Sequence, residues 1–136
     1  MFNCELFNYF NSLYCKNIAE FAQDKIEKGY DFSDSAYAEI YESFDQITRM
    51  LKDTIKMFET RDLKLANIIL EQEEQVNSNE IRLRGMHMKR LESGKCSPEF
   101  TVIYTDIIHN IEKIGDSCSN IARIILSDFD NKKNEF

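Results

Sequence analysis

Apolar side chains recur every three or four residues along four stretches of the chain, which is the spacing of one face of an α-helix. The stretches cover roughly residues 2–28, 34–58, 62–93 and 98–128. The most regular stripe lies in the last stretch and consists of Phe100, Ile103, Ile107, Ile111, Ile114, Cys118, Ile121 and Ile125. The second stretch carries a similar stripe of Ala36, Ile40, Phe44, Ile47, Leu51, Ile55 and Phe58. The pattern predicts four amphipathic helices.

The residues between these stretches are typical of helix ends. Gly29 and Gly94 stand where a glycine in the left-handed conformation commonly ends a helix. Ser33 or Ser35 can cap the start of the second helix, and Ser97, which a proline follows, can cap the fourth. Because each connection is only a few residues long, consecutive helices are expected to run antiparallel.

We therefore expect an all-α fold, an antiparallel up-down four-helix bundle. One domain is expected over residues 1–128, followed by a frayed C-terminal tail at 129–136. The chain has one proline and four glycines in 136 residues, so few positions would interrupt a long helix.

Composition and charge narrow the class of function. The net charge of −7 leaves no basic surface for nucleic acid or for an anionic membrane. No run approaches the roughly 20 apolar residues of a membrane helix, so direct membrane insertion is not expected. Four widely spaced cysteines without a paired motif are typical of free thiols in a reducing cytoplasm. The chain also has no phosphate-binding glycine motif and no nucleophile–base set, so it is not expected to be an enzyme.

A polar stripe on the fourth helix is the main candidate for chemistry. His109, Glu112 and Asp116 are spaced by three and four residues and therefore share a face beside the apolar stripe. Two carboxylates one turn apart repel each other unless a cation lies nearby. That cation is either a metal ion held by the carboxylates and His109, or a basic side chain. The basic candidates are Lys113, Arg123, Arg82 and Arg84.

A glycine lies in the middle of the same helix. Gly115 costs about 1 kcal/mol relative to alanine in a helix interior. Two explanations remain open, namely a close approach by a neighbouring helix and a space for a ligand beside Asp116.

Several motifs in this half of the chain carry a resemblance to a known family. The segment HMKRLESGKCSPEFTVIYTDIIHNIEKIGDSCSNIARI, residues 87–124, resembles the end of a PhoU-type domain. The shared features are a His followed by Arg-Leu, a glycine turn, and a last helix with Ile-Gly-Asp and Asn-Ile-Ala. The turn GKCSPE is especially similar to the cytoplasmic PhoU-like domain that follows the membrane part of sodium/phosphate cotransporter-family proteins.

The resemblance implies an architecture. A PhoU repeat is a unit of three helices, and the last three predicted helices resemble one complete repeat. The segment NIAEFAQDKIEKGYDFSDSA, residues 17–36, resembles the end of a preceding repeat and the entry to the next. The resemblance therefore implies one three-helix repeat plus the last helix of a preceding repeat.

The resemblance also implies a metal site. Family members bind iron or zinc through Glu-x-x-x-Asp motifs, one per repeat, and Glu112 and Asp116 match the second motif. His109 lies one turn before this motif, and His87 matches the histidine of the third helix.

The family pattern is incomplete in this chain, however. The histidine that usually follows the second motif is Ser117, and the first motif is replaced by Leu13 and Tyr14. These departures argue against a retained metal, so no cofactor is expected.

The function implied by the resemblance is that of a non-catalytic regulatory domain in phosphate transport or phosphate homeostasis, with a phosphate transporter or sensor protein as partner. Such a domain is expected in the cytoplasm, in some proteins tethered through an upstream membrane region. The alternative is a helical-bundle protein that binds iron or zinc through helix-borne carboxylates and histidines. The first helix is rich in aromatic residues, so a homodimer with Phe7 and Tyr14 at the interface is a further hypothesis.

Overall fold

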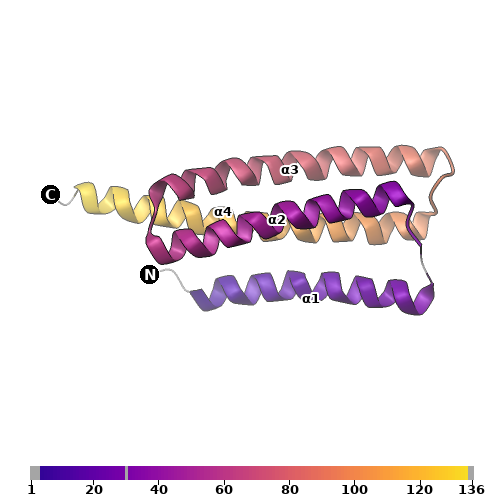
Figure 1. The fold of residues 1–136 in the computed structure, drawn as a ribbon, viewed down its shortest axis with the longest axis horizontal. Helices are drawn as coiled ribbons and strands as arrows, with labels where there is room; N and C mark the ends of the chain where they lie inside the picture. The colour runs from indigo at the N-terminus through magenta and orange to yellow at the C-terminus, as the bar shows by residue number, and fades with distance from the viewer. Residues whose placement is uncertain (1–3, 30, 135–136) are drawn as a thin grey trace.

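The fold consists of four long helices that run up and down beside one another. The structure is a computed structural model that describes the backbone of residues 4–29 and 31–134, and within them the side chains of residue 8 and residues 11–29 and 31–133 (Figure 1). Helix α1 covers Cys4–Lys28, α2 covers Asp34–Thr60, α3 covers Leu63–Glu92 and α4 covers Pro98–Asn134. The all-α, antiparallel up-down four-helix bundle predicted from the sequence is confirmed.

Side-chain caps fix where three of the helices begin. The Ser33 hydroxyl accepts a hydrogen bond from the amide of Ala36 at the start of α2. Asp62 caps α3 by accepting from two backbone amides, and the Ser97 hydroxyl accepts from the amide of Phe100 in α4. These bonds satisfy backbone donors that have no partner within the helix. At the other end of α3, Gly94 has a φ of 70°, the left-handed conformation that glycine adopts at low cost.

Helix α4 is the centre of the assembly. It packs against each of the other three helices, and α2 and α3 also pack against each other. Helix α1 packs mainly against α4, and its Lys25 also reaches α2, with Nζ 4.4 Å from the centre of the Tyr37 ring. The bundle is therefore a three-helix unit of α2, α3 and α4 with α1 added on one side of α4, which is the division that the resemblance implied.

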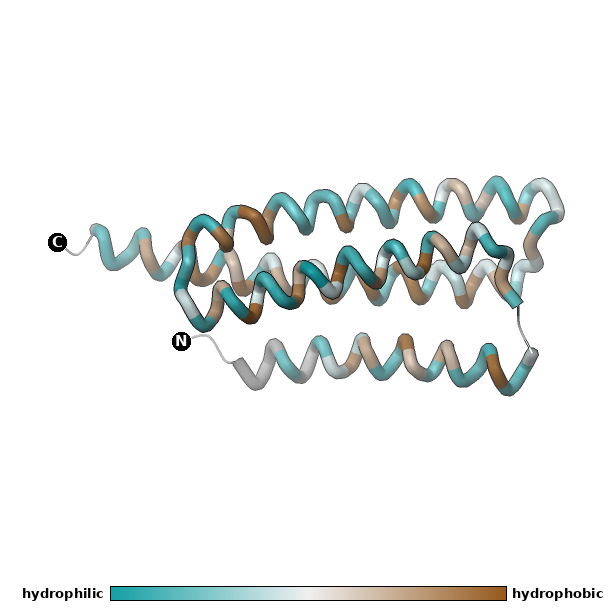
Figure 2. The backbone as a smooth tube through the Cα atoms, in the orientation of Figure 1, coloured by the Kyte–Doolittle hydropathy of each residue, from teal (hydrophilic) through white to brown (hydrophobic). Residues whose placement is uncertain are grey.

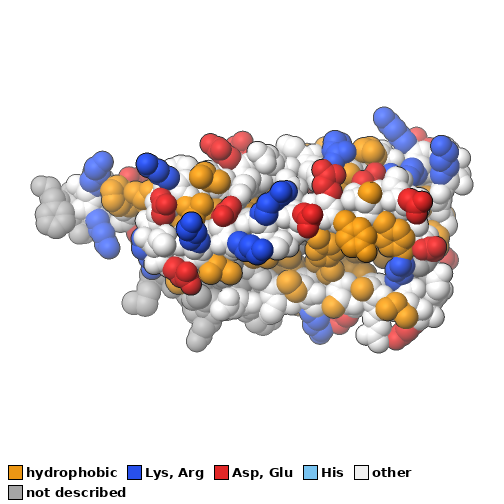
Figure 3. All heavy atoms as spheres, in the orientation of Figure 1, with side chains coloured by type: hydrophobic (Ala, Val, Ile, Leu, Met, Phe, Trp, Pro, Cys, Tyr) orange, Lys and Arg blue, Asp and Glu red, His pale blue; other side chains and the backbone are white. Residues whose placement is uncertain are grey.

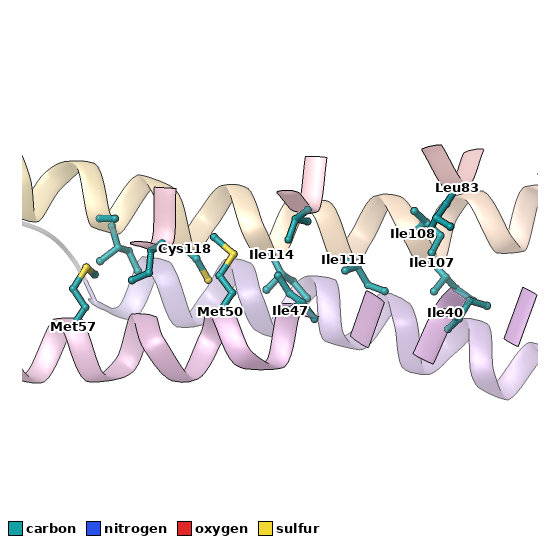
Figure 4. Close-up of a cluster of buried hydrophobic side chains, with 14 of the residues drawn as sticks. Ile40, Ile47, Met50, Met57, Leu83, Ile107, Ile108, Ile111, Ile114 and Cys118 are labelled. Atoms are coloured by element: carbon teal, nitrogen blue, oxygen red, sulfur yellow. The ribbon is translucent and has the colours of Figure 1, made fainter. Parts of the chain in front are cut away.

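The core lies among α2, α3 and α4. Figure 4 shows Ile40, Ile47 and Met50 of α2 turned towards the isoleucines of α4. Ile111 and Ile114, from the middle of the predicted stripe, are 2% exposed. Apolar and polar residues alternate along each helix, as expected for helices that bury one face (Figure 2). Burial of this apolar area is the main stabilising contribution to such a fold.

One detail of the prediction is wrong. Ile55, which was assigned to the apolar stripe of α2, is 54% exposed, whereas its neighbour Thr54 is buried and bonds the Met50 carbonyl. A spacing of threes and fours can be drawn through either residue, so sequence alone does not choose between them. Helix α4 continues through residues 129–134 of the predicted tail, and Lys132 and Lys133 in its last turn complement the helix dipole.

Helix α1 is peripheral. None of its described side chains is buried, although Tyr14, Ile18 and Phe21 pack against the edge of the core. Tyr14 thus faces its own bundle, while the side chain of Phe7 lies outside the described residues. Within the described chain, no helix has both the length and the apolar character needed to cross a membrane.

Candidate functional site

A lysine lies between the two carboxylates of the predicted motif. Lys113 Nζ is 2.8 Å from Asp116 Oδ2 and 3.2 Å from Glu112 Oε2. Of the two cations considered from the sequence, a metal ion and a basic side chain, the structure places a basic side chain of the same helix beside both carboxylates. The hydrogen bond to Asp116 and the contact with Glu112 raise the pKa of Lys113. The ammonium group thus stays charged under all ordinary conditions.

Glu112 is buried, although its neighbours in the sequence include several polar residues. Its side chain is buried against α3, whereas that of Asp116 is about one-third exposed. Burial and, after it, the hydrogen bond with Asp116 raise the pKa of Glu112, and Lys113 opposes that rise. Glu112 is therefore a buried carboxylate, whereas Asp116 is partly open to solvent.

A glutamate from the neighbouring helix completes a cluster around His109. Glu80 of α3 places its Oε1 3.3 Å from His109 Nδ1, and Glu112 Oε2 is 3.9 Å from the same nitrogen. One ligand atom from each of these three residues lies within 4.8 Å of the others. Glu80 is buried and also pairs with Arg84 at 3.2 Å. The cluster bridges α3 and α4 and is open to solvent on the side of His109.

The residues of this cluster fit a divalent metal ion in part. One imidazole nitrogen and two carboxylate oxygens are suitable ligands for zinc or iron, and small side-chain movements would bring them to coordination distance. Asp116, however, is held by Lys113, and no donor of His87 belongs to the cluster. The structure thus brings together three possible metal ligands, Glu80, His109 and Glu112. Only Glu112 and His109 were predicted from the sequence.

Gly115 allows a close approach of helices. A Cβ atom at this position would lie 3.3 Å from Val76 Cγ1, 3.6 Å from Ile47 Cδ1 and 3.7 Å from Met50 Sδ. Both α2 and α3 therefore contact α4 at this point. Of the two explanations for the glycine, the structure supports helix packing, because core side chains fill the space beside it.

His87 belongs to a second polar cluster, near the turn between α3 and α4. Its ring stacks on that of Tyr104, with ring centres 4.1 Å apart. The Arg90 guanidinium donates to His87 Nδ1 at 3.0 Å, and Cys96 Sγ lies 3.4 Å from His87 Nε2. Since arginine is always a donor, the neutral imidazole must carry its proton on Nε2. His87 is thus a packed core residue.

Glu39 of α2 anchors this second cluster. Its two oxygens accept from Arg90 at 2.8 and 2.6 Å, and one of them also accepts from the Tyr104 hydroxyl at 2.5 Å. Burial alone would raise the pKa of Glu39, but the hydrogen bonds from Arg90 and Tyr104 outweigh it and hold the pKa below its usual value. Burial, and then the charge of Arg90, lower the pKa of His87. The cluster is therefore a buried ion pair with a neutral histidine beside it, linking α2, α3 and α4.

Sequence reasoning missed Glu39, Glu80 and Tyr104. A signal was present for Glu80, because it lies on the same helical face as Val76, Leu83 and His87, where an apolar residue would be expected. Glu39 is adjacent to the stripe residue Ile40, and nothing in its local pattern separates it from the exposed acids of α2. Its role depends on Arg90, which is 51 residues away in the chain.

Comparison with known proteins places this arrangement in a family. A family model described as the PhoU domain matches residues 40–125, which is well over half of the chain. The chain belongs to the PhoU domain family. The match runs from Ile40 in α2, one residue after Glu39, through α3 and most of α4. It includes the cluster of Glu80, His109 and Glu112, and it ends before the last turns of α4.

A curated relative supports the same assignment. This PhoU domain is 23% identical over 88 residues to the phosphate-specific transport system accessory protein PhoU homolog 1 of Thermotoga maritima. The alignment covers 65% of the present chain and 38% of the relative, so the chain spans well under half of that protein's length. No solved structure gives a significant match.

Proposed function

We propose that this PhoU domain is a non-catalytic regulatory module that contacts a phosphate transporter or a phosphate sensor protein. The observation that carries the proposal is the PhoU match over residues 40–125, which takes in most of α2, all of α3 and most of α4. The name of the Thermotoga relative, an accessory protein of a phosphate-specific transport system, supports it. The buried hydrogen bonds among α2, α3 and α4 hold these helices in fixed positions. A rigid helical surface of this kind is suited to binding a partner protein. The two polar clusters join neighbouring helices, one through Glu39 and Arg90 and the other through Glu80 and His109.

The finer form of this proposal is that the domain works in the cytoplasm as part of a sodium/phosphate cotransporter-related protein. It is supported by the turn between α3 and α4, where Cys96 and Ser97 belong to the GKCSPE segment on which that resemblance rests. The test is to determine the native reading frame upstream of Met1 and the cellular fraction that holds the protein. A frame that encodes membrane helices in continuity with this domain supports the finer form, and a separately translated chain that never associates with membranes contradicts it.

The regulatory role itself is tested in cells. Deleting the gene in its native host should change phosphate uptake or the response of transport genes to external phosphate. Wild-type protein supplied from a second locus should restore the original behaviour. Glu39→Gln should restore less, in proportion to the folded protein that remains, whereas Lys16→Gln on exposed α1 should restore fully. Normal phosphate uptake and gene response in the deletion strain would contradict the role.

A second candidate function is metal binding, and the cluster of Glu80, His109 and Glu112 is the observation that favours it. Bound zinc or iron would supply a structural cross-link between α3 and α4. Elemental analysis of untagged protein separates the candidates. The regulatory proposal requires no bound metal, whereas the second candidate requires about one equivalent per chain.

A further inference from the structure

The seam between α2 and α3 contains a groove that neither polar cluster uses. It has a volume of about 760 Å³, within the range of ligand-binding sites in proteins. On the α3 side it is lined by Gln72, Gln75 and Asn79, from the polar segment EQEEQVNSNE at residues 71–80. On the α2 side it is lined by Gln46 and Arg49.

One amide in this groove is held in place with an unused acceptor. Gln72 Nε2 donates to Asp53 Oδ2 at 2.7 Å, which fixes the orientation of the amide. Its Oε1 is buried and has no hydrogen-bond partner among the described residues. Buried polar atoms in native proteins are almost always paired, so Gln72, which lines the groove, has an acceptor that can still take a donor.

The remaining groove residues divide into a fixed end and a free end. Asn79 donates to Gln46 Oε1 at 3.3 Å and accepts from Arg82 at 2.5 Å, so this end is already ordered. Gln75 and Arg49 make no hydrogen bond or ion pair with any described side chain. Donors and acceptors are therefore available towards the Gln72 end.

We propose that the groove between α2 and α3 binds an extended segment of a partner polypeptide through its main chain. A side-chain amide carries both a donor and an acceptor, as a peptide unit does, so glutamines can pair with main-chain groups whatever the partner's side chains are. From Gln72 to Arg82 the groove follows ten residues of α3, about 15 Å at 1.5 Å per residue. That length matches roughly four or five residues of extended chain at about 3.3 Å each.

The charged side chains around the groove determine which extended peptide segments can bind there. Glu42, Glu71 and Glu74 line it, against the two guanidinium groups of Arg49 and Arg82. Figure 3 shows acidic and basic side chains interspersed over α2 and α3 on this face, while hydrophobic side chains gather towards α1. An extended segment with at least one Lys or Arg, and without a large apolar anchor, is the partner that this lining fits.

The groove between α2 and α3 is a surface through which the regulatory role proposed above could act, so the proposal rests on that role. The binding test uses peptides and no phosphate transporter, so its outcome is independent of the test of the regulatory role. A phage-displayed library of random linear dodecapeptides is selected against the wild-type chain of 136 residues, and the recovered peptides are synthesised. Their Kd values are measured by fluorescence anisotropy for wild type, Gln72→Leu, Gln75→Ala and Gln23→Leu. Gln23 is an exposed amide on α1 and is the matched control.

We expect peptides enriched in Lys or Arg whose Kd rises at least tenfold with Gln72→Leu and several-fold with Gln75→Ala, and stays within twofold with Gln23→Leu. N-methylation of one or more central peptide nitrogens should weaken binding to wild type to a similar degree. Gln75 is exposed, so its variant keeps the test valid if Gln72→Leu does not fold. The proposal is overturned if no selected peptide responds to either groove variant, or if N-methylation has no effect at any position.

Discussion

At the scale of single residues, the strongest polar feature is the buried pair of Glu39 and Arg90. The two side chains are 10% and 14% exposed, and they meet at 2.6 Å. A buried pair can add little net stability compared with apolar residues, but removing one partner leaves the other charge buried alone. We therefore predict that Glu39→Gln lowers the free energy of unfolding by about 3–5 kcal/mol, measured by urea denaturation at pH 7. A loss below about 1 kcal/mol would show that Arg90 finds another partner or water.

The control for this variant is an ion pair of the same type on the surface. Lys16 and Glu20 on α1 lie 3.6 Å apart, and their side chains are 71% and 61% exposed. Because solvent screens such pairs, Lys16→Gln should leave the urea midpoint where it is in the wild type. A similar loss in both variants would mean that burial does not control the strength of these pairs.

The same carboxylate predicts a pH dependence. Since the pKa of Glu39 in the folded state lies below its usual value, ionised Glu39 stabilises the fold above the unfolded-state pKa of about 4.3. That stabilisation is lost as the pH falls through the lower, folded-state pKa. Wild type and Glu39→Gln should therefore differ most in free energy of unfolding near neutral pH and converge below about pH 4. A difference that stays constant between pH 3 and pH 7 would contradict the assignment.

At the scale of helices, the two mid-helix glycines differ in what surrounds them. A Cβ at Gly85 of α3 would meet nothing within 4 Å, whereas at Gly115 of α4 it would meet Val76 at 3.3 Å. Gly85→Ala should therefore raise the free energy of unfolding by about 0.4–1 kcal/mol through helix propensity alone. Gly115→Ala gains the same propensity but must displace Val76, so its net gain should be smaller or negative. Equal gains in urea denaturation would mean that α3 and α4 are not in close contact at Gly115.

The helices show which parts of the structure were predictable from the sequence. The apolar stripe of α4 and the caps at Ser33 and Ser97 depend on local spacing and chemistry, so they could be read directly. The partner of a buried polar residue depends on which helices are neighbours and on how they are aligned along the bundle axis. Glu39 and Arg90, and likewise Glu80 and His109, come from different helices, so their pairing follows from packing and not from the local pattern.

At the scale of the whole molecule, stability should be uneven. Helix α1 packs mainly on α4 and buries none of its described side chains, while α4 packs on all three other helices. Local opening costs less where fewer apolar contacts are broken. We predict that amides in residues 14–26 exchange with deuterium markedly faster than those in residues 107–121, measured by mass spectrometry under native conditions. Equal protection would show that α1 unfolds only together with the whole bundle.

The last prediction concerns metal and the stability of the whole fold. A metal that binds only the folded chain would raise its melting temperature, and a chelator would reverse that effect. In this chain Lys113 already lies between Glu112 and Asp116, and Glu80 is paired with Arg84. The carboxylates of the cluster thus have cationic partners without a metal, and an incoming ion would have to compete with them.

We therefore predict that EDTA leaves the wild-type melting temperature unchanged, measured by circular dichroism. Lys113→Met should melt at a lower temperature, because it removes the ammonium from two neighbouring carboxylates, and added zinc should restore part of the loss. Arg49→Met, which removes a cation outside the cluster, should respond to neither zinc nor EDTA. A wild-type protein whose melting temperature falls by several degrees in EDTA, and recovers with zinc or iron, would show instead that the cluster of Glu80, His109 and Glu112 holds a metal despite Lys113.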